Sequence, residues 1–290
     1  MFGILNSWRT VNSVLFYLTL VIAAGGLLGN GLVLWNLGFH IKKGPFNTYL
    51  LHLAAADFLF LSCQVAFSIV QAVLGSSRDT LYFVVTFLWF SAGLWLLAVL
   101  SAERCLSDVF PSCHQHCRPP HASTGLCVLV WVLTLPAVLL PANACGLLHE
   151  GTRLLACIRY HAVSVTWLLS LACVALGACL LLFIWVHCCS PRPRPTFCGI
   201  VQGSGVLLLF CRLPFILYWS LWPILNFLLP IFLPLATLLA CVDSSAKPLL
   251  YFVMGRQPGN REPLRTVLQK ALGEGSQPGA RGLSLPMGPI

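Results

Sequence analysis

The sequence predicts an all-α integral membrane protein: a seven-transmembrane helix bundle with a short amphipathic C-terminal helix. Two observations predict this fold. Of the 290 residues, 58% are hydrophobic and only 9% are charged, whereas soluble domains carry roughly 25% charged residues. In addition, stretches almost free of charge, each long enough to cross about 30 Å of hydrocarbon, recur along almost the whole chain.

Seven such stretches follow one another with short loops between them. They are 14–37, 49–74, 81–104, 122–144, 163–187, 196–222 and 228–253. The last two come from one run, 195–242, whose only formal charge is Arg212 and which is too long for a single crossing. We expect Pro223, Asn226 and Pro230 to supply the break between them.

The distribution of Lys and Arg predicts the orientation. Segments after the first, third, fifth and seventh stretches hold eleven of the seventeen basic residues, and the alternate segments hold four. Because cytoplasmic loops retain positive charge, the N-terminus is expected outside the cell and the C-terminus inside. The net charge of +9 is then mainly a topology signal with attraction to anionic membrane lipid, and nucleic acid is not an expected partner.

The chain has one membrane domain and a short tail of different character. The expected division is an extracellular N-terminus over 1–13, a seven-span domain over 14–254, an amphipathic membrane-surface helix over 255–273 and a disordered cytoplasmic tail over 274–290. Leu264, Val267 and Leu268 recur at helical spacing in the surface helix, while Pro263 suits its first turn and Gly273 its end. Gly, Pro and Ser dominate the tail.

Six short motifs lie in order along the predicted spans. They are Gly29-Asn30, Leu53-Ala-Ala-Ala-Asp57, Glu103-Arg104-Cys105, Trp131, Cys211-Arg-Leu-Pro214 and Lys247-Pro248-Leu-Leu-Tyr251. Taken together, the set resembles the fingerprints of rhodopsin-like G-protein-coupled receptors. Each motif alone is a weak signal, but six in the right order across six helices form a strong one.

The departures from that pattern narrow the resemblance. The usual cysteine at the outer end of the third span is absent from 79–88, whereas Cys145 and Cys157 lie twelve residues apart at the outer ends of the fourth and fifth spans. In an oxidising compartment these two are expected to form a disulfide. This bridge, C-x-L-P in the sixth span and SSA-x-P-x-x-Y in the seventh resemble the Mas-related receptors.

The resemblance implies a multi-pass plasma-membrane receptor that is not an enzyme and needs no cofactor or metal. Its partners would be a heterotrimeric G protein and an unknown extracellular ligand, either a small molecule or a peptide. Two alternatives remain open. One is a seven-span transporter with a proton or ion path along its buried charges, and the other is a non-coupling receptor relative that modulates partner receptors.

Four formally charged side chains lie deep in the predicted bundle: Asp57, Arg212, Asp243 and Lys247. Such charges usually mark functional sites, because an unpaired charge in hydrocarbon is costly. Asp243 and Lys247 would form a same-helix pair at i, i+4. The resemblance implies cross-helix contacts instead, Arg212 with Asp243 and Lys247 with Asp57. In related receptors sodium binds beside the span-two aspartate, and here the lysine would take its place, unless the four charges merely satisfy one another.

At the inner face, the resemblance assigns G-protein coupling to Glu103, Arg104, Pro214 and Tyr251. The arginine would be held by its neighbouring acid at rest and would meet the G protein when span six swings outward about Pro214. Tyr251 would lack its usual switch partner, because the inner half of span five contains no tyrosine. The alternative for Arg104 is a purely topological role.

At the outer face, a shallow aromatic pocket is expected from Phe87, Phe90, His161, Phe215 and Trp219. Aromatic residues at these depths are equally often interface anchors. His161 could make binding pH-sensitive, but a histidine at a helix end is more often a satisfied structural residue.

Some Mas-related receptors recognise cationic ligands with two acids flanking the bridge. Pro141 and His161 stand at those positions here, so a cationic ligand is disfavoured.

Overall fold

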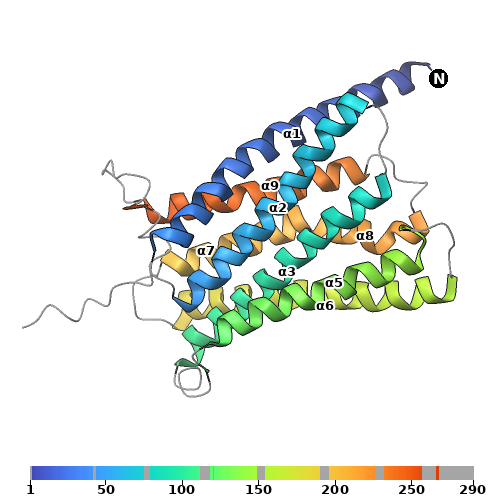
Figure 1. Cartoon of the computed structure of the whole chain (residues 1–290). Helices are drawn as coiled ribbons and strands as arrows, with labels where there is room; N and C mark the ends of the chain where they lie inside the picture. Colours follow the sequence, from blue (N-terminus) through green and yellow to red (C-terminus); the bar gives the residue numbers. More distant parts are fainter. Residues whose placement is uncertain are drawn as a thin grey trace, which may run out of the picture.

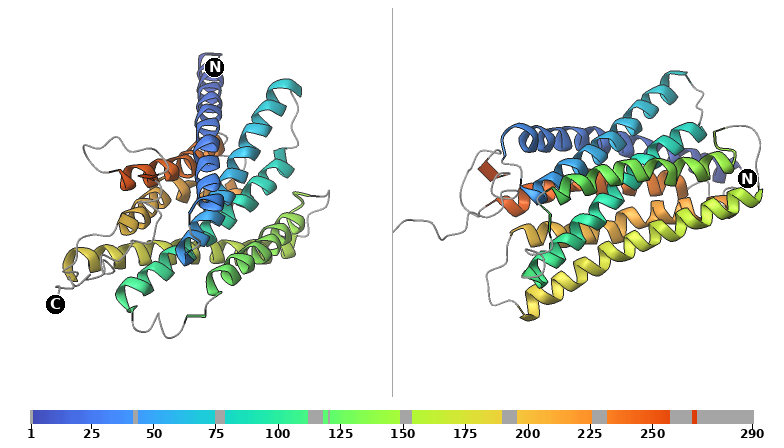
Figure 2. Two further views of the ribbon diagram at one scale, coloured as in Figure 1. Left: turned by 60° about the vertical axis from the view of Figure 1, so that its left-hand side comes forward. Right: turned by 60° about the horizontal axis from the view of Figure 1, so that its bottom comes forward.

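The computed structural model describes residues 2–41, 44–74, 79–111, 118–119, 121–148, 154–189, 196–225, 232–256 and 266–267. Within these ranges, seven spans are long and apolar enough to cross a membrane. The helices run side by side in one bundle, seen from three directions in Figure 1 and Figure 2. The predicted seven-span helical fold is therefore confirmed.

Most of the element bounds lie close to those of the hydrophobic stretches. They are α1 (Phe2–Phe39), α2 (Pro45–Leu74), α3 (Asp79–Val109), α5 (Ala122–Ala144), α6 (Leu154–Ile184), the π-helical turn η1 (Trp185–Cys189), α7 (Thr196–Leu207), the π-helical turn η2 (Leu208–Arg212), α8 (Leu213–Leu225) and α9 (Phe232–Gly255). The sixth span consists of α7, η2 and α8. Among the seven spans α3 is the most enclosed, because 78% of its most apolar 18-residue segment is buried inside the bundle.

Two helices begin earlier than the hydrophobic stretches suggest. Helix α1 begins at Phe2 and α6 at Leu154, because no proline interrupts either segment before its apolar part and a helix continues readily past the hydrocarbon. Helix α8 continues two residues beyond Pro223, so this proline does not end the span as expected. The remaining break residues, and nearly all of the predicted surface helix and tail, lie outside the described residues.

Close contact between α1 and α9 depends on small residues. A Cβ atom added to Gly26 would lie 2.0 Å from Ser245 Oγ, and one added to Gly29 would lie 3.1 Å from Pro248. Small residues allow membrane helices to approach in this way. Pro248 has no N–H, so the Ser244 carbonyl lacks its helical donor, and Asn30 Nδ2 donates to that oxygen at 3.0 Å.

Candidate functional site

A widened turn in the sixth span positions Arg212. Residues Leu208–Arg212 are π-helical, and the N–H of Leu213 donates to the carbonyl of Leu208, five residues earlier. Pro214 follows directly, and it lacks an N–H and would clash with a carbonyl in a regular α-helical register. The wider turn removes that conflict and is a feature that often accompanies functional sites. Arg212 is its last residue and is only 1% exposed.

Four buried charged side chains meet beside this turn. They come from α2, η2 and α9. Lys247 Nζ lies 2.8 Å from Asp57 Oδ2 and 2.9 Å from Asp243 Oδ2. Arg212 Nη2 lies 3.3 Å from Asp57 Oδ1, and Arg212 Nε lies 3.2 Å from Asp243 Oδ2 without the alignment of a hydrogen bond. Both predicted cross-helix contacts are confirmed, and the same-helix pair forms as well. We call these four residues the central charge cluster.

Neighbouring residues fit the central charge cluster closely. Ser244 Oγ donates to Asp57 Oδ1 at 2.9 Å, and Arg212 Cζ lies 4.9 Å from the centroid of the Phe90 ring, a cation–π contact. A Cβ atom on Gly93 would lie 2.8 Å from Arg212 Nη2. Glycine on α3 therefore leaves the space that the guanidinium group fills.

The central charge cluster is formally neutral, with two acids and two bases at 0–1% exposure. Neutrality makes its burial tolerable, because each charge lies beside opposite charges. Removing one member of such a group costs about 3–5 kcal/mol, since it leaves an uncompensated buried charge. The arrangement can hold three helices in one packing and can respond sharply to any change in their relative position.

The inner face holds a second set of paired charges around α3. Arg104 Nε lies 3.0 Å from Asp108 Oδ2, one turn along the same helix. Arg118 forms an ion pair with Glu103, and the guanidinium carbons of Arg104 and Arg118 lie 5.1 and 5.8 Å from the centroid of the Phe46 ring. We call the four charged residues the inner charge cluster.

Sequence reasoning identified Glu103 and Arg104 but missed Asp108, Arg118 and Phe46 at this site. The i, i+4 spacing of Arg104 and Asp108 is a signal that could have revealed that pair. No comparable spacing connects Phe46 or Arg118 with α3. Pro214 lies just beyond the widened turn, and Tyr251 is buried in α9, one turn beyond Lys247.

The structure brings the five predicted pocket residues together, but as a closed cluster. The rings of Phe87 and Trp219 stack with centroids 3.9 Å apart, and those of Phe90 and Phe215 are 4.7 Å apart. His161 Nε2 lies 3.2 Å from the Ser220 carbonyl. These four aromatic side chains are at most 1% exposed, so their rings fill the space that a pocket would need.

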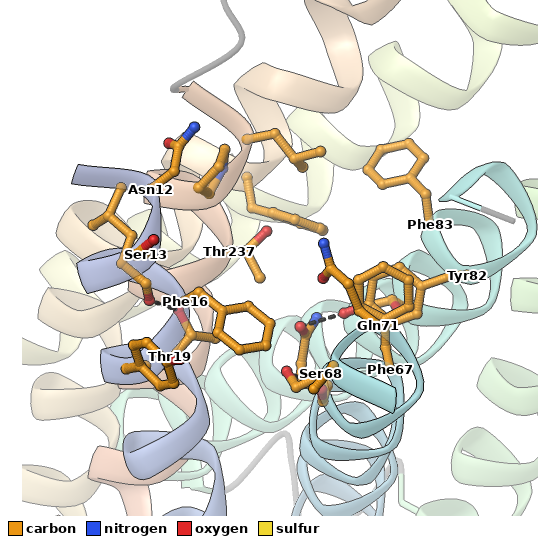
Figure 3. Close-up of a pocket in the computed structure, with 18 residues that line it drawn as sticks. Asn12, Ser13, Phe16, Thr19, Phe67, Ser68, Gln71, Tyr82, Phe83 and Thr237 are labelled. Atoms are coloured by element: carbon orange, nitrogen blue, oxygen red, sulfur yellow. Dashed lines mark hydrogen bonds between the residues drawn. The ribbon is translucent and has the colours of Figure 1, made fainter. Parts of the chain in front are cut away.

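A cavity of about 690 Å³ lies to one side, between the outer parts of α1, α2, α3 and α9. Figure 3 shows its wall, including Phe16 and Thr237. Of the five predicted pocket residues, only Phe215 contributes to it.

The predicted disulfide is confirmed. Cys145 and Cys157 are bonded, with Cα atoms 4.6 Å apart, and the bond joins the outer end of α5 to the first turns of α6. These two helices lie side by side at one edge of the bundle (Figure 1).

Comparison with known proteins gives consistent matches. Residues 29–192 match the family described as 7 transmembrane receptor (rhodopsin family). The chain is 68% identical to Mas-related G-protein coupled receptor member G of Homo sapiens over 99% of both chains, and 62% identical to member G of Mus musculus, also over 99% of both. Member E of Homo sapiens is 38% identical, over 93% of this chain and 88% of that protein.

Proposed function

The chain belongs to the Mas-related G-protein coupled receptors of the rhodopsin family, and on this premise we propose that its central charge cluster controls the step from ligand binding to G-protein activation. Membership of this family makes the chain a multi-pass plasma-membrane receptor. The family is a class of receptors and not a class of enzymes. The comparisons give no support to a transporter or to a non-coupling relative.

The observation that carries the proposal is the position of the Lys247 ammonium group. Nζ lies within 3 Å of carboxylates from two helices, Asp57 on α2 and Asp243 on α9. In related receptors a sodium ion binds beside the span-two aspartate in the inactive state. The residues here do not fit that ion, because the ammonium group already supplies a positive charge between the two carboxylates. Lys247 would therefore stabilise the resting arrangement from within the chain.

Activation would then consist of a shift between two packings of the helices, biased by the ligand. Arg212 connects the sixth span to both acids of the central charge cluster, so a movement of that span must lengthen these ion pairs. Pro214 would be the point about which α7 swings away from α3. Arg104 would then exchange its resting partners for the G protein.

G-protein recruitment tests this proposal. A panel of G proteins would be assayed in cells, both unstimulated and with compound libraries, for the parent chain and for Arg104→Ala. We expect at least a tenfold loss of recruitment in Arg104→Ala, because its guanidinium group would contact the G protein. Arg159→Ala is the matched control, since Arg159 is exposed near the outer end of α6.

Surface expression would be measured for each of the three chains. Recruitment that is equal in Arg104→Ala and the parent would contradict the role of Arg104. Silence of the parent across all G proteins, at normal surface expression, would favour a receptor relative that does not couple.

A further inference from the structure

The cavity beside α1 has a wall of uncharged residues in the part of the chain that the structure describes. Among these described side chains none is Asp, Glu, Lys, Arg or His, and the wall combines aromatic rings such as Phe16 and Phe67 with amides and hydroxyls such as Gln71 and Thr237. Its volume of about 690 Å³ lies within the range of about 300–1,000 Å³ typical of small-molecule sites. A charged molecule would lose its hydration there without gaining a counter-ion from the described wall.

The cavity lies on the face of α1 that is turned towards α9. Residues on the face towards α9 grow in size towards the outer end: Gly26, Ala23, Thr19 and then Phe16. Gly26 allows close contact with Ser245 in the middle of the membrane. Phe16 and Thr19 line the cavity from α1 and Thr237 lines it from α9, and Figure 3 shows Phe16 and Thr237 facing the space between the helices. The two helices are thus in close contact at Gly26 and enclose the cavity nearer their outer ends.

Buried polar atoms in this wall lack partners among the described residues. They are Gln64 Nε2, on a side chain that is 4% exposed, and Asn12 Oδ1. The Tyr82 hydroxyl donates to Gln64 Oε1, and this bond orients the amide so that its N–H groups remain as donors. Buried polar groups are nearly always hydrogen-bonded. The N–H groups of the Gln64 amide therefore await an acceptor.

We propose that this cavity is the binding site of an uncharged amphipathic small molecule. A carbonyl, ether or hydroxyl oxygen of the molecule accepts a hydrogen bond from the Gln64 amide, and its apolar body packs against the rings of Phe16 and Phe67. This inference rests on the proposed function, because it supplies a ligand class for the receptor. It places the ligand against α1, where Phe215 is the one member of the closed cluster of five predicted pocket residues that lines the site.

Such a ligand would lie near the central charge cluster. Phe215 lines the cavity, its ring centroid is 4.7 Å from that of Phe90, and Phe90 lies 4.9 Å from Arg212 Cζ. Two side chains therefore separate the ligand from the central charge cluster. A molecule that displaces Phe215 would alter the cation–π contact of Arg212.

Thermal unfolding of the purified full chain in lipid nanodiscs tests the inference without any signalling readout. The probes are three sets of compounds of matched size: uncharged N-benzylbenzamides, the corresponding benzylamines and the corresponding benzoates. We expect some of the benzamides, and neither charged set, to raise the unfolding midpoint by roughly 5 °C at saturation.

Variants then locate the binding site. Thr237→Phe fills the cavity and should weaken benzamide binding at least tenfold. Thr166→Phe makes the same change on α6, where Thr166 is exposed on the lipid side of the bundle, and it should bind as the parent does. Gln64→Leu keeps the volume but removes the donor, and should weaken binding by about tenfold.

Three results would overturn the inference: no stabilisation by any benzamide, equal stabilisation by the charged sets, or equal binding by Thr237→Phe and the parent. Each differs from a failure of the proposed function. If the chain bound benzamides but recruited no G protein, coupling would be refuted and the binding site would be supported. If recruitment depended on Arg104 but no benzamide bound, coupling would be supported and the binding site would be refuted.

Discussion

The central and inner charge clusters have the same composition, two acids and two bases, but very different surroundings. The side chains of the central charge cluster are at most 1% exposed, whereas those of the inner charge cluster are 11–21% exposed. Charges act strongly where the effective dielectric constant is low and weakly near water. The central charge cluster therefore fixes the packing of α2, the sixth span and α9, while the inner charge cluster can exchange partners at little cost. The second property suits a surface that must open to another protein.

The largest effect is expected from Asp57→Asn. The change removes the acid that contacts Lys247, Arg212 and Ser244, and it leaves an uncompensated positive charge inside the bundle. The unfolding free energy should fall by about 3–5 kcal/mol, measured as thermal unfolding of the purified chain. Asp57→Asn with Lys247→Met restores neutrality and should recover much of the loss. If Asp57→Asn alone were as stable as the parent, the four charges would not stabilise the packing of these helices.

Lys247→Asn should lower the unfolding free energy somewhat less than Asp57→Asn does when sodium is present. It leaves the central charge cluster with a net negative charge and an open position beside Asp57, so a sodium ion can enter. We expect the unfolding midpoint and agonist-independent signalling of the variant to depend on sodium chloride, compared with N-methylglucamine chloride. The parent should not respond. An equal response of both chains would refute the idea that the lysine takes the place of the ion.

Gly93→Ala should have an intermediate effect on the central charge cluster. The new Cβ atom would lie 2.8 Å from Arg212 Nη2, and the guanidinium group is held on its other side by two carboxylates. The expected loss is about 1–3 kcal/mol, measured by the same unfolding assay. Gly177→Ala is the matched control, because its Cβ atom would meet nothing within 4 Å, and it should be neutral or slightly stabilising. Equal behaviour of the two variants would mean that Arg212 is not tightly confined.

The smallest effect on stability is expected from Asp108→Asn in the inner charge cluster. This residue pairs with Arg104 across one helical turn at 3.0 Å, and both side chains reach water. Pairs of this kind contribute about 0.3–0.5 kcal/mol. The unfolding midpoint should therefore hardly change, while unstimulated G-protein recruitment should rise because Arg104 loses a resting partner. A loss as large as that of Asp57→Asn would remove the contrast between the two clusters.

The features that depend on the properties of the membrane could be predicted from the sequence. Spans and orientation follow from apolar length and from the placement of Lys and Arg, and the disulfide follows from two cysteines at neighbouring span ends. The spacing of Asp243 and Lys247 predicted their same-helix pair, whereas the cross-helix contacts with Asp57 and Arg212 came from the resemblance to the Mas-related receptors. The cavity could not be predicted in the same way. Whether Phe87 and Trp219 line a space or fill it depends on the rotation of α3 and α8 about their axes, and hydrophobic spacing does not fix that rotation.

The inner charge cluster was only partly predictable, for a similar reason. Glu103 and Arg104 are adjacent in the chain, but Arg118 reaches Glu103 from beyond the end of α3. A contact of this kind depends on the path of a connecting segment, which carries no periodic signal.

The widened turn at Leu208–Arg212 has a further consequence for the cytoplasmic half of the sixth span. If it tightened to regular α-helical geometry, the two halves of the span would rotate by about 100° relative to each other. Such a rotation would turn Gly203 and Gly205 away from Leu250 and Cys179, against which they now sit closely, and would bring bulkier side chains to those two neighbours. Arg212, tied to both carboxylates, opposes the rotation. The ion pairs of Arg212 at the membrane centre would thereby fix the rotation of α7 about its own axis at the cytoplasmic end of the span.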